Sequence, residues 1–259
     1  MRYKLEKIYV ALIFILLYAP ILTLVILSFN SSKSRARWGG FTLKWYRNMF
    51  DNSAIIHALW NTLAIALISA LIATIVGTAA SVAIIGMKRK MRTLVIGVTN
   101  IPMLNADIVT GISLMLLFIA SGVSFGFMTV LMAHITFNIP YVILSVMPKL
   151  RQTSRSTYEA ALDLGANPLY AFFKVVFPDI LPGVLSGFLL SFTMSLDDFI
   201  ITHFTKGPGL DTLSTKIYTE VKKGIKPEMY ALSTLLFFTV LILLIIVNVI
   251  QDKRSSTKK

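Results

Sequence analysis

Long apolar runs, separated by short polar connections, make up most of the chain. We expect membrane-spanning helices at six places: 8–29, 58–86, 104–122, 127–148, 181–204 and 229–250. Each run supplies roughly the 20 apolar residues that a helix needs to cross the hydrocarbon layer. The apolar residues are continuous rather than alternating, which favours helices over the strands of a membrane barrel. The pattern therefore predicts an all-α membrane protein with six transmembrane helices.

The third run is interrupted. Apolar character begins near Thr93, but Pro102 and Asn105 break it. A proline inside a helix removes a backbone hydrogen bond and bends the helix. Residues 93–103 therefore either lie along the membrane interface or begin a broken helix.

One polar stretch between the fourth and fifth runs has the features of a short separate helix. Ser156 and Glu159 have the spacing of a capping box, in which each side chain accepts a hydrogen bond from the other's backbone N–H. Gly165 suits the left-handed residue that follows a helix. Asn167 then caps a second helix that has Pro168 at its first position. A capped helix outside the bilayer is suited to docking on a soluble partner.

Composition agrees with a membrane protein and excludes several other classes. The chain is 56% hydrophobic and only 14% charged, whereas soluble domains are about a quarter charged. Its net charge of +13 resides in the connections between the runs, where lipid headgroups account for it, so we expect no nucleic-acid partner. The absence of cysteine excludes disulfides, thiolate metal sites and thiol nucleophiles.

The distribution of basic residues predicts the orientation. Six spans place both termini on one side of the membrane. If that side is the cytoplasm, the inner segments hold fifteen of the 25 Lys and Arg residues and the outer loops hold ten, in line with the positive-inside rule. We therefore expect cytoplasmic termini, a retained first span rather than a cleaved signal, and outer loops at about 30–54 and 205–228. This divides the chain into three parts: the first helix and first outer loop (1–54), a transmembrane core (55–250) and a disordered cytoplasmic tail (251–259).

Three carboxylates fall within the expected spans: Asp107, Asp197 and Asp198. A carboxylate in hydrocarbon is costly, so such acids usually face a pathway or a partner. Asp197 and Asp198 are consecutive, and consecutive helix positions diverge by about 100°, so one could line a path while the other pairs internally. Solvation of both at the outer interface is the alternative. Asp107 could instead stabilise the free N–H groups of a broken third helix.

Other polar residues in the spans allow two interpretations. His134, Thr136 and Asn138 form a polar stripe in the fourth span, and Asn61 and Thr62 lie in the second. Small polar groups between membrane helices commonly form interhelical hydrogen bonds. We expect packing roles for them, with substrate contact, above all at Asn138, as the alternative.

The sequence contains no motif for catalysis. It has neither the Gly-x-x-x-x-Gly-Lys-Ser/Thr phosphate-binding loop nor the His-Glu-x-x-His metal motif. Intramembrane hydrolysis by a carboxylate dyad needs two facing acids, which the adjacent Asp197 and Asp198 cannot be; a dyad of Asp107 with Asp197 is conceivable but not expected. We expect no catalytic residue and no metal site.

The segment Glu159-Ala160-Ala161-x-x-x-Gly165, followed by Val175-x-Phe177-Pro178, resembles the EAA loop of ABC importer permeases. The spacing matches in full, with Val175 in place of Ile and Phe177 in place of Leu. The resemblance covers about residues 55–250. It implies a type I ABC importer permease fold with a cytoplasmic coupling helix near 157–164, inside a coupling segment 151–180. On this resemblance the residues that couple to the ATPase are Glu159, Ala160, Ala161, Gly165 and Pro178.

Further segments are similar to the permease subunits of spermidine/putrescine importers; they are residues 28–32, 40–46, 134–140, 191–198, 207–209, 216–218 and 224–228. This resemblance implies uptake of polyamines. It also implies a second permease subunit as heterodimer partner, two ABC ATPase subunits that bind ATP and Mg, and an extracytoplasmic polyamine-binding protein. The chain itself would hold no cofactor. The candidates for the substrate pathway are Asp107, Asn138, Asp197 and Asp198.

Two other functions stay open at this stage. A permease for another small solute fits the same features, although an oxyanion would call for arginine in the path and the expected spans contain none. A secondary transporter driven by an ion gradient would leave the EAA pattern unexplained. The basic outer loops would repel a free polyamine, which a binding protein that delivers the substrate directly would overcome.

Overall fold

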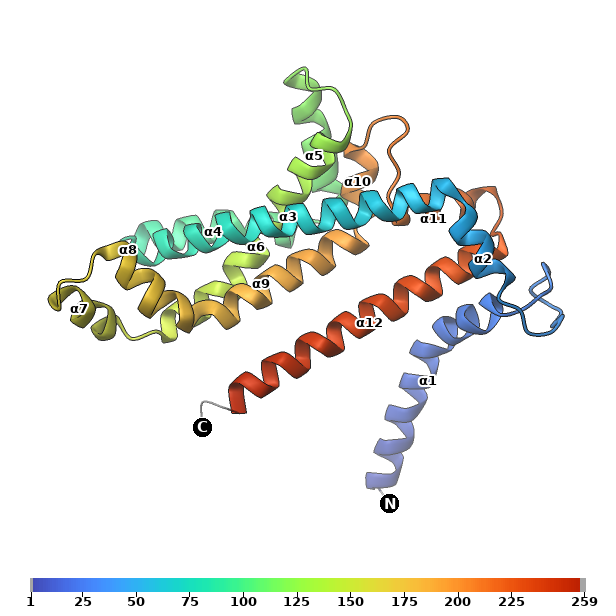
Figure 1. Ribbon diagram of the computed structural model, residues 1–259, viewed down its shortest axis with the longest axis horizontal. Helices are drawn as coiled ribbons and strands as arrows, with labels where there is room; N and C mark the ends of the chain where they lie inside the picture. The colour runs from blue at the N-terminus through green and yellow to red at the C-terminus, as the bar shows by residue number, and fades with distance from the viewer. Residues whose placement is uncertain (1, 257–259) are drawn as a thin grey trace. The chain divides into compact units, whose positions relative to one another are not determined.

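The computed structural model describes residues 2–256, apart from the side chains of residues 2–5, 8, 155, 243, 244 and 246–256. In that range the chain is almost entirely helical, and the only strand-like pairing is an isolated bridge between Asn30 and Phe41. The elements, shown in Figure 1, are α1 (Arg2–Ser28), α2 (Lys44–Asp51), α3 (Ser53–Gly86), α4 (Arg89–Leu104), α5 (Asp107–Ala120), α6 (Phe127–Gln152), α7 (Arg155–Asp163), α8 (Pro168–Ala171), the π-helix η1 (Phe172–Val176), α9 (Phe177–Asp197), α10 (Ile200–Thr205), α11 (Leu213–Lys223) and α12 (Pro227–Ser256).

Among the residues that the structure describes fully, four helical stretches are long and apolar enough to cross a membrane: Tyr9–Ser28, Ser53–Gly86, Phe127–Gln152 and Pro168–Asp197. The pair α4 and α5 would make a fifth if it counts as one bent span. In α12 the apolar stretch with described side chains, Pro227–Ile242, is shorter. The all-α membrane architecture is thus confirmed, while the count of six spans stays a prediction.

Two of the expected spans had the wrong limits. The third does not run over 104–122, because α4 ends at Leu104, α5 begins at Asp107 and the two helices meet at 103°. The fifth does not run over 181–204. Its helical stretch begins upstream at Pro168 and ends at Asp197, because Asp198 has an extended backbone (ψ 128°) and α10 starts a new helix at Ile200.

The expectation of a disordered tail was also wrong for its described part, since α12 continues to Ser256; residues 257–259 lie outside the described range. Contacts divide the chain into two compact units. One consists of the residues up to His57 together with those from Lys216 onward, and the other is Ala58–Thr215. In the first unit α12 contacts both α1 and α2, and Trp45 and Met49 of α2 are buried.

The second unit is built on α3, α6 and α9, which lie side by side (Figure 1). Val142 and Val146 of α6 pack against Ala73 of α3 and against Ile180 and Val184 of α9. Glycines permit this close approach, as small residues commonly do between membrane helices. A Cβ on Gly77 of α3 would lie 2.7 Å from Val142 Cβ, and a Cβ on Gly187 of α9 would lie 3.2 Å from Val142 Cα.

Candidate functional site

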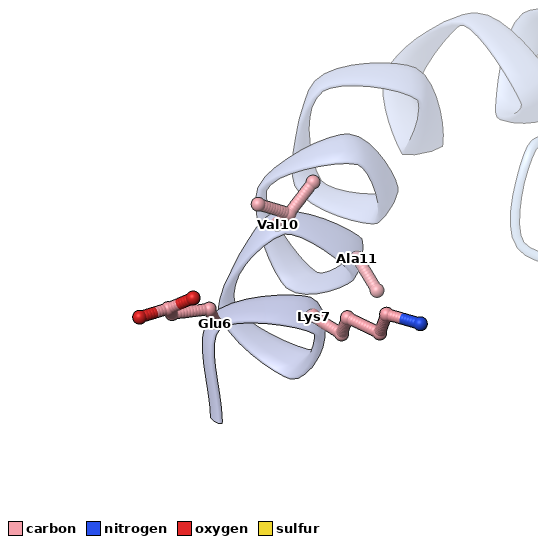
Figure 2. A pocket seen from close by; sticks show the side chains of 4 residues that line it. All are labelled: Glu6, Lys7, Val10 and Ala11. Carbon is pink, nitrogen blue, oxygen red and sulfur yellow. The ribbon is translucent and has the colours of Figure 1, made fainter. Parts of the chain in front are cut away.

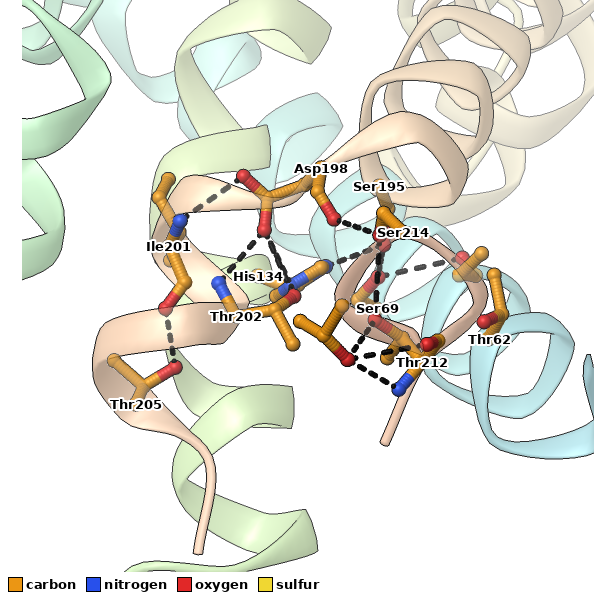
Figure 3. Close-up of polar contacts among 12 residues, drawn as sticks. Thr62, Ser69, His134, Ser195, Asp198, Ile201, Thr202, Thr205, Thr212 and Ser214 are labelled. Carbon is orange, nitrogen blue, oxygen red and sulfur yellow. Dashed lines mark hydrogen bonds and ion pairs between the residues drawn. The ribbon is translucent and has the colours of Figure 1, made fainter. Parts of the chain in front are cut away.

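A chain of buried polar side chains connects α3, α6 and α9 in the second unit (Figure 3). His134 on α6 is 1% exposed, and its Nδ1 lies 2.6 Å from Ser195 Oγ on α9. Ser195 Oγ is 3.1 Å from Ser69 Oγ on α3. Asn138, one turn along α6, donates from Nδ2 to Ser69 Oγ at 3.4 Å. Because hydrogen-bonded groups are the ones that tolerate burial, this network joins the three helices.

The other ring nitrogen of His134 faces the break between α9 and α10. Its Nε2 lies 2.9 Å from Thr202 Oγ1 and 3.4 Å from Asp198 Oδ2. The Asp198 carboxylate also accepts hydrogen bonds from the backbone N–H groups of Ile201 (3.1 Å) and Thr202 (2.7 Å). Asp198 thus caps the start of α10, and its backbone carbonyl accepts from Ser214 Oγ at 2.6 Å.

Ser195, His134 and Asp198 are the residue types of a hydrolytic triad, but their geometry differs from that of one. In such a triad the carboxylate orients one ring nitrogen and the serine hydroxyl donates to the other. Here Asp198 is more closely bound to Thr202 than to the ring. Ser195 is 3% exposed and shares its hydroxyl with Ser69, so a substrate cannot reach it in this conformation. The arrangement fits helix packing and not hydrolysis.

Two buried polar atoms beside this network have no hydrogen-bond partner among the described residues: Asn138 Oδ1 on α6 and Ser191 Oγ on α9. Both residues are fully buried. Asn138, a candidate for the substrate pathway, therefore lies inside the packed unit and not on an open surface. Of the expected stripe on α6, His134 and Asn138 are buried, whereas Thr136 is exposed and donates only to the Met132 carbonyl of its own helix.

The other two pathway candidates lie outside the network. Asp197, the last residue of α9, and Asp107, the first residue of α5, are both exposed. Asp107 lies in the first turn of its helix, where the helix dipole favours a negative charge. Asp198 and Asn138 are linked through His134, Ser195 and Ser69, and neither Asp197 nor Asp107 takes part in this chain of hydrogen bonds.

Asn61 and Thr62 of α3 also form packing contacts. Asn61 Nδ2 donates to the Asp211 carbonyl at 3.1 Å, and Thr62 Oγ1 accepts from the Leu213 N–H at 2.8 Å. They hold the segment before α11 against α3.

The segment that resembles the EAA loop forms the short helix α7, with one difference at its start. The predicted capping box is wrong, because α7 begins at Arg155 and its N-cap is Ser154, which makes no side-chain cap. Ser156 instead shares a hydrogen bond of 2.6 Å with Ser154. The helix starts two residues earlier than predicted, which places Ser156 and Glu159 outside the capping positions.

The end of α7 agrees with the prediction. Gly165 has φ +84°, the left-handed conformation that glycine adopts at lowest cost. Its N–H donates to the Leu162 carbonyl at 2.9 Å, and the Ala166 N–H donates to the Ala161 carbonyl at 3.1 Å. These two bonds define a Schellman motif, which stops the helix sharply.

The next helix follows at once, and Asn167 caps it by accepting from the Leu169 N–H at 3.0 Å. Pro168 occupies its first turn, as predicted. Several apolar side chains around α7 and α8 are exposed: Leu164 (90%), Leu169, Tyr170 and Phe173. An exposed apolar group of this kind marks a surface suited to protein contact.

A shallow hollow on α1 offers no comparable site. It is lined by Glu6, Lys7, Val10 and Ala11, which lie on neighbouring turns of one helix (Figure 2). Among the residues with described side chains, its lining comes from α1 alone.

Sequence reasoning missed Ser69, Ser195 and Thr202 as members of the buried network. One signal was present. Small residues recur every four positions along α9, at Gly183, Gly187, Ser191 and Ser195, and this spacing places them on one helix face. The structure packs this face on α6, where Gly187 meets Val142 and Ser195 meets His134.

The sequence family described as "Binding-protein-dependent transport system inner membrane component" matches residues 76–256. The chain belongs to this family. Among curated members, the "Spermidine/putrescine transport system permease protein PotC" of Escherichia coli (strain K12) is 37% identical over 242 residues, which cover 93% of this chain and 92% of that protein. The "Putrescine transport system permease protein PotI" of the same strain is 40% identical over 231 residues, covering 86% and 82% of the two chains.

Solved structures of ABC transporters share the fold. A chain of a bacterial ABC transporter for import of the acidic polysaccharide alginate superposes with a TM-score of 0.74 at 16% identity, covering 98% of this chain and 94% of that one. A chain of the MetNI methionine ABC transporter gives a TM-score of 0.62 at 18% identity, with 76% and 94% covered. At such low identities the likeness establishes the permease fold of ABC importers and nothing about the solute.

Proposed function

We propose that this chain is the membrane-spanning permease subunit of an ATP-driven ABC importer that carries polyamines into the cytoplasm. The observation that carries the proposal is the identity of 37% and 40%, over most of the chain, with permeases named for spermidine and putrescine transport. Permease subunits of this kind are not enzymes. In this proposal the chain hydrolyses nothing, and ATP and Mg bind to a partner ATPase.

In the proposed assembly the chain pairs with a second permease subunit, and two copies of an ABC ATPase subunit bind on the cytoplasmic side. Both termini and α7 lie on that side. Glu159 and Ala160 are exposed on α7, so the helix is available to sit in a cleft of the ATPase, with Ala161 and Gly165 holding its C-terminal end through the Schellman motif.

Movement of α7 has a continuous route to the transmembrane helices. η1 contacts α7, α8 and α9, and Pro178 lies in the first turn of α9. When ATP binding closes the ATPase dimer, α7 would follow, and α9 with its partners would alternate between inward-open and outward-open states. Such a change needs contacts that differ between two states.

The substrate requires negative charge or oriented acceptors, because a polyamine carries two or more ammonium groups. The exposed carboxylates of Asp197 and Asp107 are available for this role. Asp198 and Asn138 would contribute only in a conformation that opens the network around His134, since their hydrogen bonds are internal in the present one.

The test is reconstitution of the importer in proteoliposomes. With the partner permease, the ATPase and the spermidine-loaded binding protein, we expect ATP-dependent uptake of radiolabelled spermidine or putrescine. Uptake by this chain alone, driven by an ion gradient, would instead support a secondary transporter. ATPase stimulation by an unrelated solute, with none by polyamines, would identify the chain as a permease for that solute.

A further inference from the structure

The connection after α1 is folded around the side chain of Asn30, which is 2% exposed. Its Oδ1 accepts hydrogen bonds from the N–H groups of Ser32 (3.1 Å) and Gly39 (2.8 Å). Its Nδ2 donates to the Arg37 carbonyl at 2.9 Å. The Asn30 side chain is thus hydrogen-bonded to backbone groups as far as nine positions along the chain, at Gly39.

The base of this loop is closed by backbone and aromatic contacts. The Ser31 N–H donates to the Gly40 carbonyl at 2.9 Å, and Trp45 Nε1 donates to the Asn30 carbonyl at 2.7 Å. Gly39 fits so tightly that an added Cβ would lie 2.6 Å from Ser31 Oγ. We call residues 30–41 the Asn30 loop; these hydrogen bonds hold its backbone in shape.

The Asn30 loop displays three cationic side chains at alternate positions, Lys33, Arg35 and Arg37, and all three are exposed. No acidic residue occurs between Glu6 and Asp51, so the surrounding sequence does not neutralise this charge. Asn30 bonds the backbone carbonyl of Arg37 and not its guanidinium. The loop is therefore held through its backbone, and the three charged side chains extend from it.

A free polyamine would be repelled by this loop, so the substrate is not its ligand. The family depends on a binding protein, and a protein that binds a polycation must present carboxylates around its cleft. We propose that the Asn30 loop is the docking surface for the acidic rim of the binding protein that delivers the substrate. This inference rests on the proposed function and on the topology that places the loop outside. Anionic lipid headgroups would also be attracted, but mobile headgroups need no preformed loop shape.

The test uses the complete importer in nanodiscs and measures its affinity for the spermidine-loaded binding protein at several salt concentrations. In the triple variant Lys33→Ser/Arg35→Ser/Arg37→Ser we expect about a 10-fold weaker affinity at low salt, from three exposed ion pairs, and a flatter salt dependence. The matched control Lys44→Ser/Arg47→Ser/Lys223→Ser removes the same charge from exposed positions outside the loop, and we expect a change of less than about 3-fold.

A second variant tests the shape of the loop while all three charges remain. Gly39→Ala forces the loop away from Ser31, and we expect weaker docking by about 3-fold or more, as misplaced interface contacts cause. Unchanged affinity in both the triple variant and Gly39→Ala would overturn the inference. The inference would also be overturned if the triple variant docks normally but loses activity to an extent that depends on the anionic lipid content of the nanodisc. If the wild-type complex shows no polyamine-stimulated ATPase activity, the proposed function itself fails. If the wild-type complex is active and the variants dock as well as it does, only the inference about the docking surface is rejected.

Discussion

His134 Nε2 and Asp198 Oδ2 are 3.4 Å apart, and the two side chains are 1% and 8% exposed. The same carboxylate oxygen accepts from the Thr202 N–H at 2.7 Å and from Thr202 Oγ1 at 2.8 Å. Asp198 therefore joins the break between α9 and α10 to α6, and His134 continues the connection to Ser195 and Ser69. Because α9 also contacts η1, which in turn contacts α7, this buried pair lies between α6 and the end of the helix that would carry movement from the ATPase.

Asp198→Asn should destabilise the protein. The amide replaces one acceptor oxygen with an NH₂ group that faces the donors of Thr202 or Ile201, so we expect a loss of about 1–3 kcal/mol. Thermal unfolding of the purified complex measures it. Asp197→Asn is the matched control, since that carboxylate is exposed and its loss should change stability by less than about 0.5 kcal/mol.

The same two variants separate structure from transport. Spermidine uptake per assembled complex should fall in Asp197→Asn if this exposed acid contacts the substrate. Asp198→Asn should impair uptake more than assembly. Wild-type uptake in Asp198→Asn would restrict Asp198 to a structural role.

His134→Ala should weaken the packing of α6 against α9. It leaves the hydroxyl groups of Ser195 and Thr202 without their ring partner in a buried place, at a cost of about 1–3 kcal/mol. Chemical denaturation in detergent provides the measurement. Thr136→Ala, on the exposed side of the same helix, should be close to neutral; equal losses in the two variants would contradict a specific role for the network.

Gly77→Ala tests the close contact of α3 with α6. The new methyl group would meet Val142 at less than 3 Å, and such overpacking costs about 1–3 kcal/mol. For Gly97→Ala in α4 we expect the opposite effect, a gain in stability. Nothing lies within 4 Å of the added Cβ, and alanine favours a helix over glycine by about 1 kcal/mol. Melting temperatures should therefore move in opposite directions.

Gly165→Val should uncouple ATP hydrolysis from uptake. Open space surrounds the position, so the effect comes from its positive φ, which costs a residue with a Cβ about 1–2 kcal/mol and disrupts the end of α7. Gly122→Val is the control, with φ +67° in a turn away from α7 and equally open space. Uptake per ATP hydrolysed should fall in the first variant and persist in the second, with both inserted in the membrane.

Glu159→Lys reverses the charge at an exposed position of α7 without altering its end. We expect it to abolish ATP-driven uptake while the chain still inserts and folds. If uptake survives both this change and Gly165→Val, α7 is not the coupling helix.

The sequence by itself determined the helical membrane architecture, the short helix α7 and its sharp end. These features depend on local chemistry: continuous apolar residues, a glycine where φ is positive and an asparagine–proline helix start. It failed where two local preferences competed. Nothing nearby showed that Ser154 rather than Ser156 would precede α7, or that the run through Asp198 would break instead of continuing as a helix.

Only the tertiary structure decided which polar residues act together. His134 and Ser195 are 61 positions apart and Ser69 and Ser195 are 126 apart, so no local pattern could pair them. Their hydrogen bonds form because small residues on α9 and α3 let the helices approach α6 closely, and buried polar groups then require one another as partners. Helix packing also buries the Asp198 side chain and leaves that of its neighbour Asp197 exposed. The sequence could not show which of these two identical adjacent residues would be buried.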